Sequence, residues 1–232
     1  MITKDVSISA KKISPHTHAF IFDNDNTLLA NGITDKWRLI VAYLPAILVT
    51  FVSHPILIFN LLKDELLDEN SACSQQWQEL FKQMGNQRSA EYQFSRFVEQ
   101  WAAMKTIVPG MDTLIQQLHD AGYRLSLWTD MGAKDGHVIE KKFPHLYHLF
   151  TLRSYVTYEQ DTDAIRKPSE QAVKKFVTLY QHTYHENKTL IFVDDKLKNC
   201  LAAKKYGAFD YIQFKSPEHL RTLLHSFHTF DH

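Results

Sequence analysis

The sequence is poor in cysteine and has no excess of either charge sign. Its two cysteines, Cys73 and Cys200, lie far apart in 232 residues, which excludes a disulfide scaffold and a CxxC metal site. Lysine and arginine together number 26, as do aspartate and glutamate, so the formal net charge is zero. A chain without surplus positive charge lacks a general electrostatic attraction to nucleic acid. We therefore expect no nucleic-acid partner.

Signals for metal-binding histidines and for secretion are also missing. The 13 histidines show no HExxH or similar ligand spacing, which argues against a histidine metal cluster. Residues 1–14 are mixed and charged and contain no apolar core of a signal peptide, so a reducing cytoplasm is the expected location. Hydrophobic residues make up 44% of the chain and charged residues 22%. This composition suffices for one large domain, or for a core with a modest insertion.

Three short apolar runs, each of strand length, organise the rest of the sequence. They cover residues 19–22, 125–128 and 190–193. Mostly apolar runs of this length are typical of buried parallel strands. Stretches with helical spacing accompany them over residues 110–121, 168–181 with Pro168 in the first helical position, 197–206, and onward from Ser216. Alternating strands and helices predict an α/β fold with a doubly wound parallel sheet.

The region of residues 31–106 interrupts this alternation. Four large aromatic residues in it keep helical spacing with their apolar neighbours: Trp77, Phe81, Phe94 and Trp101. The spacing favours packing of these rings between helices over a wall against substrate. The predicted domains are therefore an α/β core of residues 15–30 and 107–232, and an all-α insertion of residues 31–106.

A polar residue follows each of the three strand-like runs. Asp23 follows the first, Thr129 the second and Asp194 the third. Ligands of open α/β sheets bind in a crevice beyond the carboxyl ends of the strands. One polar residue at a strand end is common in any protein, but three together predict a functional site.

Two carboxylates stand two residues apart just after the first strand. Of Asp23 and Asp25, one can attack a phosphorus atom and form an aspartyl-phosphate, while the other gives a proton to the leaving oxygen and later takes one from water. A D-x-D sequence also occurs in Ca²⁺-binding loops, but an EF-hand needs glycine at its sixth position and glutamate at its twelfth. Leu28 and Thr34 occupy those positions, which excludes this alternative.

A phosphate dianion next to two carboxylates needs positive charge. Mg²⁺ is the usual cation where carboxylate and phosphate oxygens meet, and Asp194 and Asp195 supply further acidic groups. Lys167 can supply a fixed positive charge, and Thr129 a hydroxyl for a phosphoryl oxygen. Asn199 can hydrogen-bond to Lys167 or to a carboxylate, or can be an ordinary polar residue early in a helix.

Four separate motifs contain these residues. They are residues 20–28 (FIFDNDNTL), 125–130 (LSLWTD), 166–169 (RKPS) and 191–195 (IFVDD). With these motifs, in this order, the chain resembles the haloacid dehalogenase superfamily, the aspartate-nucleophile phosphohydrolases. The resemblance covers residues 18–40 in part and 106–225 well, and it implies a Rossmann-like core.

The resemblance implies a role for each candidate residue. Asp23 is the nucleophile and Asp25 is the general acid and base. The phosphate-binding candidates are Thr129, Asp130, Lys167 and Asn199, of which Thr129 and Lys167 also act in catalysis. The implied Mg²⁺ site consists of Asp23, Asp25 through its backbone carbonyl, Asp194 and Asp195.

Asp25 also narrows the reaction that the resemblance implies. True dehalogenases of the superfamily lack the second carboxylate, because no leaving alcohol needs a proton. We therefore expect a Mg²⁺-dependent phosphatase that hydrolyses phosphate monoesters through a phospho-aspartate on Asp23. A protein phosphatase acting on phosphotyrosine or phosphoserine and a phosphomutase are the alternatives within the superfamily. The expected substrate is a small phosphorylated metabolite or a phosphoprotein.

The resemblance also implies that residues 31–106 form a C1-type helical cap, which covers the crevice and excludes bulk water. Within them, residues 39–62 contain no Asp, Glu, Lys or Arg, a length sufficient for a membrane span. A single span would leave Asp23 and Lys167 on opposite sides of the bilayer, so we expect short buried cap helices instead. An apolar hairpin at a membrane surface and a patch for a protein partner or a second copy are the alternatives. A non-enzymatic docking module that uses this stretch is the alternative function.

Overall fold

The computed structural model describes residues 5–9, 12–30, 41, 43–44, 81–82, 87–156 and 165–227, with only the backbone for residues 87–94. Contacts between residues divide the chain into two compact units. The first comprises Met1–Ala30, Thr106–Gly136 and Phe143–His232, and the second comprises Asn31–Lys105 and His137–Lys142. The role of the second unit as a cap stays a prediction.

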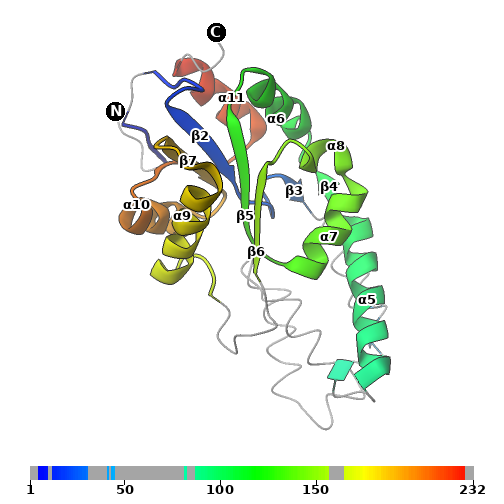
Figure 1. The fold of residues 1–232 in the computed structure, drawn as a ribbon. Coiled ribbons are helices and arrows are strands. Elements are labelled where there is room, and N and C mark those ends of the chain that lie inside the picture. The colour runs from blue at the N-terminus through cyan, green and yellow to red at the C-terminus, as the bar shows by residue number, and fades with distance from the viewer. Residues whose placement is uncertain are drawn as a thin grey trace. The chain divides into compact units, whose positions relative to one another are not determined.

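The first unit is built on a mostly parallel sheet (Figure 1). Among the described residues it has six strands, in the spatial order β1 (Val6–Ser7), β8 (Asp210–Gln213), β7 (Thr189–Asp194), β2 (His18–Phe22), β5 (Arg124–Gly132) and β6 (Leu152–Val156). Neighbouring strands are parallel, except that β1 runs antiparallel to β8. From β2 the chain passes to β5 and β6 on one side, and then to β7 and β8 on the other. This is the predicted α/β fold with a doubly wound parallel sheet.

Helices cover both faces of this sheet (Figure 1). One face carries α9 (Glu170–Tyr184) and α10 (Leu197–Gly207), and the other carries α6 (Met111–Asp120), α8 (Pro144–Tyr147) and α11 (Pro217–Ser226). Successive residues of a strand point to opposite faces, so β2 serves both. Ala19 and Ile21 belong to the core beneath α9 and α10, whereas the Phe20 ring packs against Tyr123 with centroids 5.2 Å apart. A short second sheet pairs β3 (Leu29–Ala30) with β4 (Thr106–Ile107).

Two of the boundaries that differ from the predicted ones lie next to candidate site residues. The helix expected to open at Pro168 begins at Glu170, because Ser169 is its N-cap and the Ser169 hydroxyl accepts a hydrogen bond of 3.2 Å from the Ala172 N–H. Such a cap satisfies an amide that has no partner within the helix. The strand expected to end at Trp128 continues as β5 to Gly132, with a shift of register against β6 after Trp128.

The helix α5 (Gln87–Met104) belongs to the second unit. Its Phe97 ring lies 6.1 Å from the Phe81 ring and 5.6 Å from the Tyr43 ring, measured between centroids. Phe81 and Phe97 are both buried. Phe81 therefore packs between elements of the insertion, as its helical spacing predicted. Trp101 is half-buried, with the Lys105 ammonium 4.4 Å from its ring centroid.

Lys142 holds the C-terminal end of α5. It is the last residue of α7 (Ala133–Lys142). Its Nζ donates to the carbonyl oxygens of Ala102, Ala103 and Lys105, at 3.0, 2.6 and 2.7 Å. The last carbonyls of a helix have no partners within the helix. One ammonium group thus satisfies three backbone acceptors where α5 ends.

Most of the apolar stretch 39–62 lies outside the described residues, as do Trp77 and the side chain of Phe94. Val41, Tyr43 and Leu44 are its described members. The three interpretations of this stretch therefore stay predictions. In the part of the chain that the structure describes, no helix combines the length and the apolar character that crossing a bilayer requires.

Candidate active site

Three neighbouring strands, β7, β2 and β5, bring the predicted polar residues to one edge of the sheet. Asp23 directly follows β2, and its N–H donates to the Val193 carbonyl oxygen at 2.9 Å, which continues the pairing with β7. Asp194 ends β7, and Thr129 lies in the last part of β5. All three residues are buried. Because the strands are parallel neighbours, their carboxyl ends meet at the same edge.

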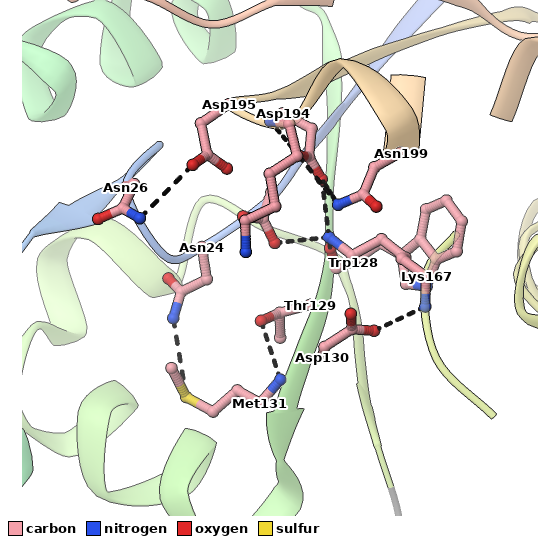
Figure 2. A network of polar contacts seen from close by, with 12 residues as sticks. Asn24, Asn26, Trp128, Thr129, Asp130, Met131, Lys167, Asp194, Asp195 and Asn199 are labelled. Carbon is pink, nitrogen blue, oxygen red and sulfur yellow. Dashed lines mark hydrogen bonds and ion pairs between the residues drawn. The ribbon is translucent and has the colours of Figure 1, made fainter. Parts of the chain in front are cut away.

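Lys167 forms ion pairs with both Asp23 and Asp194, and Figure 2 shows the contact with Asp194. The lysine Nζ donates to Asp23 Oδ1 at 2.6 Å, to Asp194 Oδ2 at 3.0 Å and to the Trp128 carbonyl oxygen at 3.0 Å. The side chain of Lys167 is 2% exposed and that of Asp194 is fully buried. The Lys167 ammonium, the fixed positive charge expected from the sequence, therefore lies between the carboxylates of Asp23, just after β2, and Asp194, at the end of β7.

Burial and neighbouring charges shift the titration of these groups. Burial raises the pKa of Asp23 well above its usual range; Lys167 opposes the shift, and the Asp194 and Asp25 charges add to it. Burial alone would lower the pKa of Lys167, but the attraction of Asp194 and Asp23 outweighs it, and the pKa of Lys167 is raised. The lysine is therefore a permanent cation. One buried cation among several carboxylates leaves an excess of negative charge.

Asp194 is held in a fixed orientation. Asn199 Nδ2 donates to both of its carboxylate oxygens, at 3.1 and 3.0 Å, and the Lys196 N–H donates to Oδ1 at 2.8 Å. Asn199 is buried in the first turn of α10. Of the partners that the sequence left open to Asn199, the structure shows a carboxylate. Contact of Asn199 with phosphate stays a prediction.

Asp195 completes an acidic cluster with Asp23 and Asp194. Each of the three offers an oxygen that lies within 4.8 Å of the oxygens of the other two. Asp195 Oδ1 is buried and has no hydrogen-bond partner, and burial, with the charge of Asp194, raises the pKa of Asp195 to about 6. Carboxylate oxygens are the ligands of hard divalent cations such as Mg²⁺ and Ca²⁺. A cation would satisfy the orphaned oxygen and offset the negative charge, so the residues fit a metal site.

A tight turn carries Asp25 past the first aspartate. The Asn24 carbonyl oxygen accepts hydrogen bonds from the N–H groups of Leu28 and Leu29, both at 2.9 Å. Asn26 is left-handed, with φ of 59°, a conformation that asparagine tolerates better than most residues. The Asp25 carboxylate is not one of the three that form the acidic cluster. Its predicted contribution to a metal site, through the backbone carbonyl, is untested.

Thr129 and Asp130 have different partners. Thr129 Oγ1 accepts a hydrogen bond of 3.1 Å from the Met131 N–H. Asp130 Oδ1 accepts one of 3.0 Å from the backbone N–H of Lys167. Asp130, which the sequence suggested for phosphate binding, thus fixes the backbone that carries Lys167. Direct contact of either side chain with phosphate stays a prediction.

Sequence reasoning missed several residues around the acidic groups. Asn26 Nδ2 donates to Asp195 Oδ2 at 3.5 Å, and Gln213 Nε2 donates to the Asp195 carbonyl oxygen at 3.1 Å. Asn24 is fully buried. The place of Asn24 and Asn26 within the D-x-D turn is a signal that could have singled them out. Gln213, at the end of a short strand, carries no such signal.

A model of the haloacid dehalogenase-like hydrolase family matches residues 17–207. The chain belongs to this family. The match includes Asp23, Thr129, Lys167 and Asp194, the four residues that the fold brings to one edge of the sheet. No curated protein matches the chain.

Solved structures of haloacid dehalogenase (HAD) proteins share the fold at low sequence identity. A HAD family enzyme from Bacteroides thetaiotaomicron is 16% identical with a TM-score of 0.55, covering 90% of this chain and 98% of its own. The HAD hydrolase YfnB from Bacillus subtilis, solved bound to magnesium, is 14% identical with a TM-score of 0.54, covering 90% and 99%. A dehalogenase solved as an intermediate complex is 14% identical with a TM-score of 0.50, covering 86% and 85%. At these identities the likeness shows the fold alone, which hosts more than one reaction.

Proposed function

We propose that this HAD hydrolase is a Mg²⁺-dependent phosphatase that cleaves phosphate monoesters through a phospho-aspartate on Asp23. The observation that carries the proposal is a second carboxylate, Asp25, placed two residues after a buried aspartate that pairs with Lys167. Cleavage of a carbon–halogen bond needs no acid for an alcohol leaving group, whereas cleavage of an ester does. Asp25 therefore favours a phosphate ester over a haloacid.

Asp23, Asp194 and Asp195 would hold the metal ion. When bound, Mg²⁺ supplies positive charge that favours the ionised form of Asp23 and lets a phosphate dianion approach the carboxylates. The all-oxygen donor set and the unpartnered Asp195 Oδ1 support this choice, as does the magnesium bound to the relative YfnB.

The first half of the reaction transfers the phosphoryl group to the protein. A carboxylate oxygen of Asp23 attacks phosphorus and forms a new P–O bond, while the P–O bond to the alcohol breaks and the alcohol oxygen takes a proton from Asp25. Lys167 Nζ and the Thr129 hydroxyl bind phosphoryl oxygens. Asp130 keeps Lys167 in place through its hydrogen bond to the Lys167 backbone N–H.

The second half of the reaction returns the protein to its starting state. Asp25, now a carboxylate, takes a proton from water as the water oxygen attacks phosphorus. The P–O bond to Asp23 breaks, and inorganic phosphate leaves. In a phosphomutase a hydroxyl of the substrate would replace the water, so the fate of the phosphoryl group separates the two alternatives.

Hydrolysis of p-nitrophenyl phosphate tests the proposal. The wild-type protein should release nitrophenolate with Mg²⁺ and stop in excess EDTA, and Asp23→Asn should lower kcat by roughly a thousandfold or more. Asp120→Asn, at a residue whose side chain is 65% exposed on α6, is the matched control and should keep full activity. Undiminished activity of Asp23→Asn would contradict the proposal.

The substrate class needs a separate comparison. Phosphorylated metabolites and phosphopeptides should be assayed side by side for phosphate release, with chloride release from a 2-chloroacid as the test for dehalogenation. We expect phosphate release from at least one monoester and no chloride release. Chloride release without phosphate release would assign the protein to the dehalogenases.

A further inference from the structure

A buried hydrogen-bond network of Tyr147, Asn24 and Met131 lies next to Asp23 and has no part in the reaction steps above. Asn24, the residue between Asp23 and Asp25, is fully buried. Its side-chain oxygen accepts a hydrogen bond of 2.5 Å from the Tyr147 hydroxyl. Its side-chain nitrogen points to Met131 Sδ, 3.7 Å away (Figure 2). Tyr147 is itself 1% exposed, so the whole network is shielded from water.

The backbone of Asn24 is fixed at the same place. Its carbonyl oxygen accepts the N–H groups of Leu28 and Leu29 and thereby closes the turn that carries Asp25. Side chain and backbone of one residue thus tie the turn to its surroundings. A displacement of Asn24 must move the residues on either side of it, which are Asp23 and Asp25.

Both ends of the network, Tyr147 and Met131, lie in well-packed elements. The Tyr147 ring, at the end of α8, lies 6.2 Å from the Phe150 ring, which lies 6.2 Å from the Phe22 ring at the end of β2. Met131 lies in β5, and its N–H donates to Thr129 Oγ1. The network therefore connects the turn of Asp23 and Asp25 to β5, the strand that carries the Thr129 hydroxyl proposed to bind phosphate.

We propose that Tyr147 and Asn24 are positioning residues, whose hydrogen bond sets the place of the Asp23–Asp25 turn relative to Thr129. The inference rests on the proposed function. A hydrogen bond in a shielded site is strong and directional, and removal of the Tyr147 hydroxyl leaves the Asn24 oxygen without a partner. In-line attack depends on such placement, because a shift of about 1 Å in a reacting group costs roughly a hundredfold in rate.

The kinetic test compares Tyr147→Phe with Tyr180→Phe on p-nitrophenyl phosphate. Tyr180 is the matched control, because it is also buried and its hydroxyl donates to Glu186 at 2.9 Å, away from the acidic cluster. Tyr147→Phe should lower kcat about tenfold or more and change KM by less than about threefold. Tyr180→Phe should leave kcat unchanged. Equal kcat for wild type and Tyr147→Phe would overturn the inference.

A double-mutant cycle separates positioning through Asn24 from a general loss of packing. Tyr147→Phe should lower kcat strongly in the wild-type background and less than about twofold in an Asn24→Ala background, since the bond that it removes is then already absent. Equal factors in the two backgrounds would show that the hydroxyl does not act through Asn24, and would overturn the inference.

Hydrogen exchange decides the inference without any assumption about the substrate. Tyr147→Phe should speed exchange of the Leu28 and Leu29 amides, which bond to Asn24, and leave the amides of α10 protected as in wild type. Tyr180→Phe should change neither. If the wild-type protein fails to hydrolyse the ester, the proposed function fails while this measurement still applies. Unchanged exchange at Leu28 and Leu29 would then reject the positioning role.

Discussion

Two ion pairs of equal length act very differently in this protein. Lys167 Nζ lies 2.6 Å from Asp23 Oδ1, and Lys174 Nζ lies 2.6 Å from Glu170 Oε1. The side chains of the first pair are 2% and 10% exposed, and those of the second, on the surface of α9, are 65% and 49% exposed. Water and salt screen the exposed pair, so it contributes little to stability. The buried pair has lost the hydration of both charges.

Burial, rather than the distance between the charges, determines how an ion pair contributes to stability and chemistry. A buried pair seldom adds net stability, because its attraction must first offset desolvation. Loss of one partner is nevertheless costly, since the other charge stays buried. Such an arrangement at the end of three parallel strands is more readily explained by chemistry than by folding.

Removal of the two lysines gives the largest expected contrast. Lys167→Met should destabilise the protein by about 3–5 kcal/mol, because Asp23 and Asp194 lose their buried counter-charge. Lys174→Met should leave stability almost unchanged. Urea unfolding of both variants in metal-free buffer measures the difference. Similar losses of stability for the two lysine variants would contradict this role of burial.

Addition of Mg²⁺ should distinguish the carboxylates of the acidic cluster from an exposed carboxylate. A metal ion that binds the folded protein at about 100 times its Kd should stabilise it by about 2.7 kcal/mol. Asp195→Asn removes one proposed ligand and should weaken this effect, whereas Glu170→Gln should retain it in full. Thermal unfolding over a Mg²⁺ titration checks both. An unchanged Tm of the wild-type protein across the Mg²⁺ titration would contradict the metal site.

Two helix caps whose hydrogen bonds have the same length form a second matched pair, this time of neutral groups. The hydroxyls of Ser169 and Ser216 each accept a hydrogen bond of 3.2 Å from an N–H in the first turn, of α9 and α11 respectively. Replacement of either by alanine should cost about 1 kcal/mol of stability. Ser169→Ala should also lower the proposed phosphatase activity, because Ser169 lies two residues after Lys167, and Ser216→Ala should not. Unfolding and kinetics of the two variants, measured together, test this.

His18, which is buried, gives the smallest effect, through a lowered pKa. Burial lowers the pKa of His18 below 6.5, against the attraction of Asp210 and a hydrogen bond with Ser14. Protonation therefore favours the unfolded chain, so this part of the stability is present above pH 6.5 and is lost as the pH falls below it. His18→Gln should flatten the fall in stability between about pH 7.5 and about pH 5.5. Guanidinium unfolding at both pH values checks the slope, and an unchanged slope would contradict the assignment.

The sequence predicts the centre of the sheet better than its sides. β2, β5 and β7 lie in the middle and are buried on both faces, so their runs are almost continuously apolar. β6 and β8 escaped prediction because they are short and mixed: β6 reads LRSYV with three half-buried residues, and β8 reads DYIQ with polar ends. The β-strand propensity of single residues is a weak guide for such strands, because the strands with which they pair determine their position.

The candidate site could likewise be predicted only in part. The meeting of Asp23, Thr129 and Asp194 could be predicted, because adjacent parallel strand ends share one edge of the sheet. The partners of individual polar atoms could not, because they depend on backbone geometry within a few ångströms. Tyr147 lies 123 residues from Asn24, and no periodic pattern in the sequence connects them.

The three carbonyls at the end of α5 bear on any attempt to transplant the insertion between relatives. Their common donor, Lys142, comes from a helix that is encoded after β5 rather than within residues 31–106. A chimera cut at the two ends of that range would take the acceptors and leave the donor behind. The transferable segment is therefore discontinuous, and a graft needs residues 137–142 as its second piece.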